Sequence, residues 1–274
     1  MKLVSFSTPG GKVRPGVLAG DKVVDLSTVG YADALAAITA GLTVPPDGPA
    51  FPLTQVKLHA PIANPPRIFA IGLNYRDHAI ESKMALPKTP VIFFKLQTAI
   101  IGQDDAIVLP KNSTQPDYEA ELAFVIGKGG FRIPASAWRE HVYGYTIIND
   151  VSARDVQLAT SQWSMGKSFP TFCPMGPAIV TADEIPDPHS LAIGLSIGGE
   201  VLQNSNTREL IFRIPDLIEY ISSIAPLLPG DMVSTGTPSG VGMGRSPQRW
   251  LKPGETVTVT IEGLGSLTNP VVAE

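Results

Sequence analysis

Acidic side chains with strand-like spacing are the residues of this sequence best suited to chemistry. The segment DYEAELAFVI, residues 117 to 126, alternates polar and apolar residues, so on a β-strand Asp117, Glu119 and Glu121 share one face. The Cα atoms of Glu119 and Glu121 would lie roughly 7 Å apart, and both side chains can reach one cation. Two carboxylates this close repel each other unless a positive charge lies between them. The spacing therefore indicates a cation site.

A further acid, Asp150, ends an apolar segment that begins at Tyr145. Together, Glu119, Glu121 and Asp150 would form an all-oxygen site, and oxygen ligands select hard cations such as Mg²⁺, Mn²⁺ or Ca²⁺ over zinc or copper. For an isolated Glu-x-Glu pair, the simpler interpretation is two solvent-facing residues on a half-exposed strand. The hydrophobic surroundings of these acids, and a single lysine, Lys167, in the following loop, favour the cation site.

A histidine and a glutamate, His78 and Glu81, stand at i and i+3 of the segment NYRDHAIE. On a helical turn they share a face and can hydrogen-bond. A carboxylate partner raises the basicity of a histidine, so such a pair could hold a water molecule and take its proton. In isolation, this polar segment is more typical of a turn at the surface. Both interpretations stay open at the level of sequence.

Two further motifs lack the residues that their familiar functions require. Gly166-Lys167-Ser168 could belong to a phosphate-binding loop, but Ser161 stands where that loop needs its first glycine. Ser164 and Lys167 have the spacing of a serine nucleophile and a lysine base, yet no companion Ser-Asp-Asn or Lys-Thr-Gly motif follows. We predict neither a phosphate-binding loop nor a serine hydrolase.

The composition of the 274 residues indicates a turn-rich globular protein, with 26 glycines, 26 prolines and 43% hydrophobic residues. A net charge of −4 and scattered basic residues argue against nucleic acid as a partner. The longest uncharged stretch, residues 168–182, contains three prolines, so we expect no membrane-spanning helix. The lone cysteine, Cys173, excludes an internal disulfide and agrees with a reducing compartment, so we expect a cytoplasmic protein.

The elements that must position these residues are mainly short strands. We predict strands at residues 3–7, 13–18, 22–26, 67–72, 91–95, 118–126, 142–150, 177–181, 191–197, 231–234 and 255–261. Helices are predicted at residues 31–38, from 152 to about 162, and at 215–225. Because strands and helices do not alternate regularly, a mixed or mainly antiparallel β-roll or barrel is expected in place of a doubly wound parallel sheet. Prolines around residues 61–66 suggest a domain boundary there.

Five segments together resemble the fumarylacetoacetate hydrolase family. They are residues 72–78, 117–122, 149–157, 166–169 and 236–242, in the order of the family's motifs. The resemblance covers about residues 66–272 and implies a mainly β (α+β) fold. It implies a mixed β-roll or barrel catalytic domain at residues 63–274, a small N-terminal α/β domain at residues 1–62, and a homodimer.

The resemblance also implies roles for individual residues. It assigns a divalent metal, Mg²⁺ or Mn²⁺ with Ca²⁺ as a crystallographic substitute, to Glu119, Glu121 and Asp150. It makes His78 and Glu81 the water-activating pair, Lys167 a substrate and oxyanion contact, and Tyr75, Arg76, Gln157 and Thr237 the substrate-binding residues. Independently of the resemblance, residues 76–87 are rich in charge and end at a proline, which makes them a candidate lid over the substrate. Pro170 departs from the family pattern and would remove one backbone N–H donor to substrate.

From the resemblance we expect a metal-dependent hydrolase that cleaves a carbon–carbon bond in a small 2,4-dioxo acid, such as an acylpyruvate or a fumarylpyruvate. Decarboxylation of an oxaloacetate-like 2-oxo acid, isomerisation of a 2-hydroxydienoate and a lyase reaction are alternatives at the same metal site. A non-catalytic binding protein ranks below them, because His78, Glu81 and Lys167 are all present.

Overall fold

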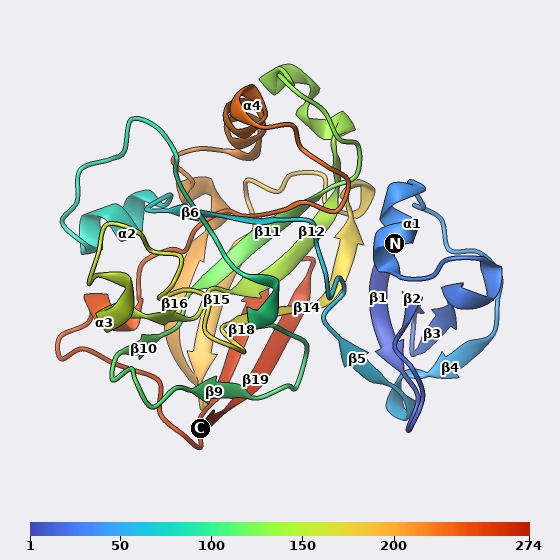
Figure 1. Cartoon of the computed structure of the whole chain (residues 1–274), viewed down its shortest axis with the longest axis horizontal. Helices are drawn as coiled ribbons and strands as arrows, with labels where there is room; N and C mark the ends of the chain where they lie inside the picture. The colour runs from blue at the N-terminus through green and yellow to red at the C-terminus, as the bar shows by residue number, and fades with distance from the viewer.

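The computed structural model describes residues 1–274 and consists mainly of strands with few helices (Figure 1). The helices are α1 (Ala34–Thr39), α2 (Arg76–Glu81), α3 (Arg154–Gln157) and α4 (Ile214–Ile224). The strands are β1 (Lys2–Ser7), β2 (Arg14–Ala19), β3 (Lys22–Asp25), β4 (Ala50–Pro52), β5 (Lys57–His59), β6 (Ile68–Gly72), β7 (Val91–Phe94), β8 (Ile100–Ile101), β9 (Ile107–Leu109), β10 (Pro116–Asp117), β11 (Ala120–Ile126), β12 (Val142–Asn149), β13 (Ser152–Ala153), β14 (Cys173–Thr181), β15 (Ala192–Ile197), β16 (Glu200–Asn206), β17 (Met232–Ser234), β18 (Thr256–Ile261) and β19 (Gly265–Ala273). The predicted mainly β, α+β class is confirmed.

Two mixed sheets make up most of the molecule. The larger has twelve strands, ten of them in the order β4-β3-β2-β1-β14-β12-β11-β17-β6-β7, with β5 on β1 and β8 on β14. The smaller has five strands in the order β16-β15-β18-β19-β9. Most neighbours are antiparallel, but β17 with β6, β14 with β8 and β19 with β9 are parallel. The two mixed sheets pack on each other, which gives the predicted mixed β-roll.

The main hydrophobic core lies where β11 and β12 of the larger sheet contact β15 and β18 of the smaller one. Leu122 and Phe124 of β11 join this core, whereas Ala123 and Val125 point to the opposite face and join a second core. Every residue of β11 is buried. The half-exposed strand considered for the two glutamates is therefore wrong, because both faces of this strand are covered.

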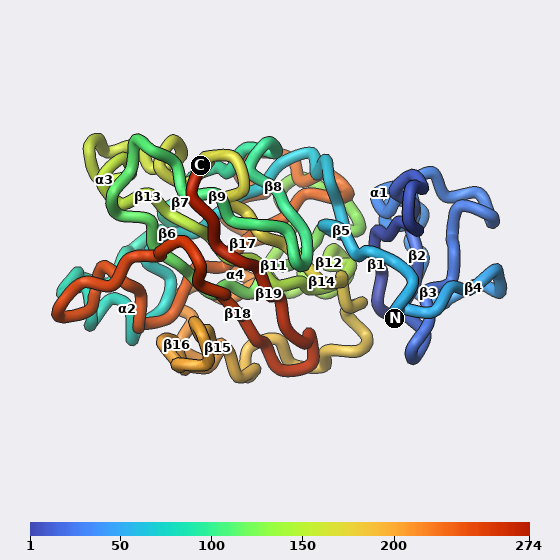
Figure 2. The backbone as a smooth tube through the Cα atoms, turned by 90° about the horizontal axis from the view of Figure 1, so that it is seen from below, coloured from blue at the N-terminus to red at the C-terminus, as the bar shows by residue number.

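The N-terminal strands β1–β4 and α1 lie together at one end of the long axis in both views (Figure 1 and Figure 2). The larger sheet nevertheless continues across, because β1 pairs antiparallel with β14. Leu3 and Val17 of this N-terminal unit share a core with Val125 of β11. The division into residues 1–62 and 63–274 stays a prediction. None of the helices has the length and apolar character needed to cross a bilayer.

The helix predicted from residue 152 to about 162 is much shorter than expected, since α3 ends at Gln157. Ser152 does not cap it, because its hydroxyl donates to the carbonyl of Asp150, at 2.8 Å. Asp155 instead accepts hydrogen bonds from Ser113 and Thr114. The residues after α3 therefore form a loop, and this loop carries the predicted Lys167 back to the sheet.

The packing of β11 predicts the effect of removing its largest side chain. Phe124→Ala should lower the free energy of unfolding by about 3–5 kcal/mol, because Phe124 is fully buried between the two sheets. Phe131→Ala is the matched control, since Phe131 is 50% exposed and its loss should cost no more than about 0.5 kcal/mol. Urea denaturation of both variants measures the difference. Equal losses would contradict the described core.

Candidate metal centre

Antiparallel pairing of β11 with β12 brings the three predicted acids together. Ala120 lies opposite Asn149, so Glu119 just before β11 meets Asp150 just after β12. The Asp150 N–H donates to the Glu119 carbonyl, at 2.9 Å. One carboxylate oxygen from each of Glu119, Glu121 and Asp150 lies within 4.8 Å of the other two, and all three residues are buried. The predicted convergence of these acids is what the structure shows.

Three cationic side chains surround the cluster. Lys167 Nζ bridges Glu119 Oε2 at 2.6 Å and Asp150 Oδ2 at 2.8 Å. Lys95 Nζ contacts the other oxygen of Asp150, Oδ1, at 2.5 Å. Arg154 Nη2 lies 2.6 Å from Glu119 Oε1. Both oxygens of Glu119 and of Asp150 are thus paired with a positive charge, whereas no ion pair reaches Glu121.

The pKa values reflect this unequal pairing. Burial alone would raise the pKa of Glu119, but the charges of Arg154 and Lys167 outweigh it and hold the pKa at about 2. Burial and the negative charges of Asp150 and Glu119 raise the pKa of Glu121 well above its usual value. Burial opposes the charged form of Lys167, yet the carboxylates of Asp150 and Glu119 raise its pKa. Glu121 is therefore the acid of the cluster that lacks a compensating cation.

A divalent cation fits this arrangement. The donor atoms are all carboxylate oxygens, two from the β11 segment and one from the end of β12, and oxygen ligands are the set preferred by Mg²⁺, Mn²⁺ and Ca²⁺. The Ser234 hydroxyl at 2.5 Å and the Gly236 N–H at 3.0 Å both donate to Glu121 Oε2 and orient this carboxylate. Glu119, Glu121 and Asp150 are the residues that would hold such an ion.

The predicted histidine–glutamate pair is formed on α2. His78 Nδ1 lies 3.1 Å from Glu81 Oε2, and the Gly240 N–H donates to Glu81 Oε1 at 2.8 Å. The start of α2 is held by Asp77, which accepts from the Ser205 hydroxyl at 2.6 Å. His78 is buried and lines a cavity. The surface-turn interpretation is therefore wrong.

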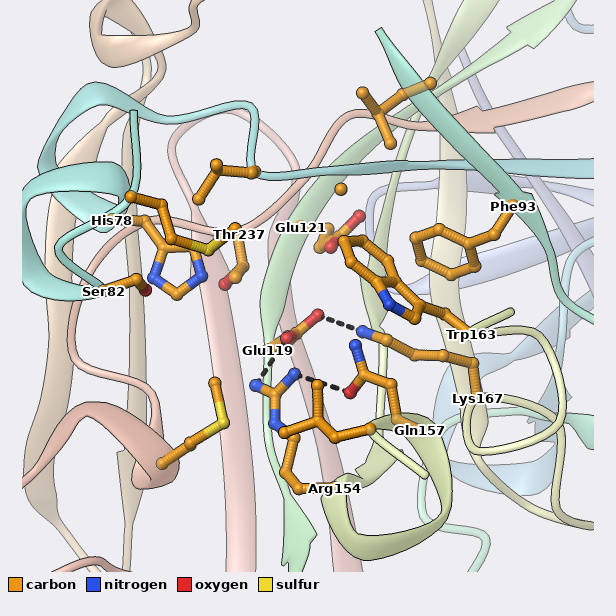
Figure 3. A pocket seen from close by; sticks show the side chains of 16 residues that line it. His78, Ser82, Phe93, Glu119, Glu121, Arg154, Gln157, Trp163, Lys167 and Thr237 are labelled. Atoms are coloured by element: carbon orange, nitrogen blue, oxygen red, sulfur yellow. Dashed lines mark hydrogen bonds and ion pairs between the residues drawn. The ribbon is translucent and has the colours of Figure 1, made fainter. Parts of the chain in front are cut away.

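A cavity of about 120 Å³ separates the pair from the acids. His78 lies on one side of it, and Glu119, Glu121 and Lys167 face it from the other elements (Figure 3). The remaining lining residues are Ile71, Gly72, Leu73, Ser82, Met84, Phe93, Arg154, Gln157, Leu158, Trp163, Thr237 and Met243. Asp150 does not line the cavity, and its two carboxylate oxygens are paired with Lys95 and Lys167. The cavity thus has a charged side and largely apolar walls.

Two of the four predicted substrate-binding residues line the cavity. Gln157 Oε1 accepts from Arg154 Nη1 at 3.0 Å, which leaves the amide NH₂ group available as a donor. Thr237 Oγ1 accepts from Gln203 Nε2 at 2.8 Å, so the hydroxyl hydrogen is available as well.

The other two predicted residues lie outside the cavity. Tyr75 is fully buried in the main core, and Arg76 donates to the Leu210 carbonyl at 2.9 Å. Neither residue lines the cavity. Pro170, expected to remove a donor to substrate, borders a different hollow beside Val108.

Three residues of the site were not predicted from the sequence. They are Lys95 and Arg154, which pair with the acids, and Asp117, which orients Arg154. Asp117 Oδ2 accepts from Arg154 Nε at 2.8 Å, and its Oδ1 accepts from the Gly242 N–H at 2.7 Å. Asp117 therefore orients the arginine that pairs with Glu119. A charged residue at the end of the apolar segment VIFFK was the available signal for Lys95.

Comparison with known proteins agrees with an enzyme built around a carboxylate cluster suited to a divalent metal. The family described as Fumarylacetoacetate (FAA) hydrolase C-terminal matches residues 67–272. The mitochondrial oxaloacetate tautomerase fahd2 of Xenopus laevis is 48% identical over 221 residues, which are 80% of this chain and 69% of that protein. The chain belongs to the fumarylacetoacetate hydrolase family.

Solved structures extend the similarity to the whole chain. The fumarylacetoacetate hydrolase of psychrophilic Exiguobacterium antarcticum superposes with a TM-score of 0.90 at 36% identity and covers 100% of both chains. The maleylpyruvate hydrolase of Sphingobium sp. SYK-6, solved with manganese (II) ion and pyruvate, gives a TM-score of 0.83 at 31% identity over 100% of this chain and 99% of that one. The chain is therefore an enzyme of this family.

The raised pKa of Glu121 predicts that metal binding releases protons, because a ligand carboxylate must be ionised. Calorimetric titration with Mn²⁺ should give different heats in buffers of different ionisation enthalpy, and affinity should weaken as the pH falls. Glu121→Gln should weaken binding and release fewer protons. Glu140→Gln, an exposed acid paired with Lys128, is the control and should behave like the unaltered protein. Identical heats in all buffers would contradict the prediction.

Proposed function

We propose that the protein is a divalent-metal-dependent enzyme that interconverts the keto and enol forms of a small 2-oxo diacid such as oxaloacetate. The observation that carries the proposal is His78, paired with Glu81, facing Glu119 and Glu121 of the three-carboxylate cluster across one small cavity. Enolisation moves one proton from the carbon beside the 2-oxo group to its oxygen. A base on one side and an electrophilic site on the other supply what this transfer requires.

The size of the cavity and the named relatives support a small substrate. About 120 Å³ is well below the roughly 300–1,000 Å³ of pockets for drug-sized ligands. The Xenopus laevis relative is named an oxaloacetate tautomerase, and the Sphingobium enzyme was solved with pyruvate, itself a short 2-oxo acid. We therefore rank keto–enol tautomerisation above the hydrolysis expected from the sequence.

The side chains of this protein provide contacts for an acid of this kind. A cation held by Glu119, Glu121 and Asp150 would polarise the 2-oxo group of the bound acid and favour charge on its oxygen. Gln157 and Thr237 have free donors that face the cavity and can orient a carboxylate. Such fixed donors act strongly in a buried site, because no water reorganises around the developing charge.

The proton transfer falls to His78. Its Nδ1 is held by Glu81, so Nε2 is the nitrogen left to take or return a proton. The Gly240 N–H fixes the second oxygen of Glu81, which keeps the pair aligned. A positioned imidazole of this kind contributes on the order of 10²- to 10⁴-fold to proton-transfer reactions. The same pair could remove a proton from water instead of carbon.

Hydrolysis of a 2,4-dioxo acid is therefore the second candidate. It is favoured by the His78–Glu81 pair, which suits water activation, and by the resemblance to a maleylpyruvate hydrolase. The homodimer and the cytoplasmic location expected from the sequence remain parts of the proposal, supported by the family resemblance and by the lone cysteine.

The function is tested by following freshly dissolved oxaloacetate with Mg²⁺ or Mn²⁺ and the purified protein. Ultraviolet absorbance reports the enol, and mass spectrometry identifies the products. Faster keto–enol equilibration without loss of mass supports the tautomerase. Release of CO₂ would identify a decarboxylase, and cleavage of acetylpyruvate to acetate and pyruvate would identify a hydrolase. Metal ions without protein provide the background rate.

Replacing the proposed base predicts a large kinetic loss. His78→Asn should lower kcat by on the order of 10²- to 10⁴-fold, because proton transfer loses its base. His59→Asn is the control, since His59 hydrogen-bonds Ser7 and does not line the cavity. Steady-state kinetics of both variants gives the comparison. A His78 variant with unaltered kcat would overturn the assignment.

Replacing Lys167 tests the proposed oxyanion contact. Lys167→Met should lower kcat on the order of 10²- to 10³-fold, the usual effect of removing one such donor. Mn²⁺ binding, measured in parallel, separates this effect from loss of the metal. Lys128→Met removes an exposed lysine and should leave kcat and KM as they are. If Lys167→Met changes KM alone, the side chain only binds substrate.

A further inference from the structure

One wall of the cavity is formed by an indole ring that the proposed chemistry does not use. Trp163 lies in the loop between α3 and β14 and is half-buried. In Figure 3 it lies across the cavity from His78, beside Phe93 and close to Lys167 and Glu121. The Trp163 and Phe93 ring centroids are 5.8 Å apart, with their planes at 65°. The two rings together form a continuous aromatic wall next to the acids.

The indole is in close contact with the end of β6. It packs against the bare backbone of Gly72, where an added Cβ would lie 2.2 Å from Trp163 Cζ3. Any side chain at position 72 would therefore collide with the indole and force it to shift. A glycine at the end of β6 is required by this close approach, and the ring fills the space that a side chain would otherwise occupy.

The loop that carries Trp163 is anchored just after the indole. The Phe94 N–H donates to Ser164 Oγ at 3.2 Å, and the Leu96 N–H donates to Ser168 Oγ at 3.1 Å. Gly166 packs on Gln157, because a Cβ there would lie 2.4 Å from the Gln157 nitrogen. The same short segment delivers Lys167 to the acids. The position of the indole is therefore coupled to that of a site residue.

Two other apolar lining residues are more exposed than Trp163. Met84, which follows α2, and Leu158, which ends α3, are 53% and 57% exposed. Exposed, unbranched or surface side chains change rotamer at little cost, whereas a ring packed on backbone and on a second ring does not. The cavity thus combines one rigid wall at Trp163 with an adaptable side at its mouth.

We propose that Trp163 is a specificity-determining residue that limits the substrate to 2-oxo acids no longer than oxaloacetate. This inference rests on the proposed function for the class of substrate. Trp163 and Phe93 line the cavity beside Glu121, so the proposal places the far end of an acid bound at the carboxylate cluster against this aromatic wall, where each added methylene would meet the indole. Exclusion by a rigid apolar wall discriminates about tenfold or more per methylene.

The test uses stable 2-oxo diacids of increasing length, namely 2-oxomalonate, 2-oxoglutarate and 2-oxoadipate. Their affinities for the Mn²⁺-loaded protein are measured by calorimetry, so the readout does not depend on turnover. The unaltered protein should bind 2-oxoadipate at least about 100-fold more weakly than 2-oxomalonate, because 2-oxoadipate has two methylenes more than oxaloacetate. Trp163→Ala should remove most of this difference, and Trp163→Phe should give an intermediate value.

Leu158→Ala is the matched control, because it shortens an apolar lining residue that is 57% exposed. It should leave the length preference as in the unaltered protein. If Leu158→Ala changes the preference and Trp163→Ala does not, the acid extends past the mouth and the inference is wrong. Equal affinities for all three acids in the unaltered protein would also overturn it. Thermal unfolding and Mn²⁺ titration confirm that each variant is folded and loaded.

Turnover separates this inference from the proposed function. If the protein does not enolise oxaloacetate but Trp163→Ala reduces the differences in affinity among the three diacids, the length limit is supported and the tautomerase proposal is wrong. If the protein enolises oxaloacetate but Trp163→Ala leaves these differences unchanged, the tautomerase proposal is supported and the length limit is wrong. If both proposals are right, Trp163→Ala should raise kcat/KM for longer 2,4-dioxo acids, relative to kcat/KM for oxaloacetate, by about tenfold.

Discussion

The repulsion among three buried carboxylates is the constraint on which the rest of the site depends. Charges out of water are costly unless they are paired, and Glu119, Glu121 and Asp150 lie too close together to be left alone. Lys95, Lys167 and Arg154 approach them from three separate parts of the chain, and both oxygens of two of the acids are paired. Glu121 has no such partner, so a divalent cation bound there would compensate its charge. The acids cannot move apart, because the buried strands β11 and β12 hold them.

One glycine-containing segment connects the two halves of this site. The Gly240 N–H holds Glu81 of the histidine pair, and the Gly242 N–H holds Asp117, which in turn holds Arg154 beside the acids. The His78–Glu81 pair and the carboxylate cluster are thus both held by backbone N–H groups of the same short segment. Their separation is set by local hydrogen bonds, which gives a proton donor and acceptor a defined distance.

The strands and the acids could be predicted because their signals are local. Alternation in residues 117–126 defines one face of β11, and the motif segments carry every acid of the cluster. Lys95 could not be placed in the same way, because it meets Asp150 across 55 residues of sequence. The polar strand β16 was missed because its ladder with β15, not its residue types, stabilises it. Trp163 acquires its importance only through the bare backbone of Gly72, a contact that no local pattern encodes.

The placement of acids on strands and of the aromatic wall on a loop has an evolutionary consequence. β11 and β12 are buried throughout, so replacements there disturb folding as well as chemistry. Position 163 is half-buried on a connecting segment, where mutations are tolerated more readily. Lineages of this scaffold can therefore acquire new substrates by exchanging wall residues while inheriting the reactive centre intact. Such a separation lets one ancestral fold give rise to enzymes that differ in what they accept and share how they react.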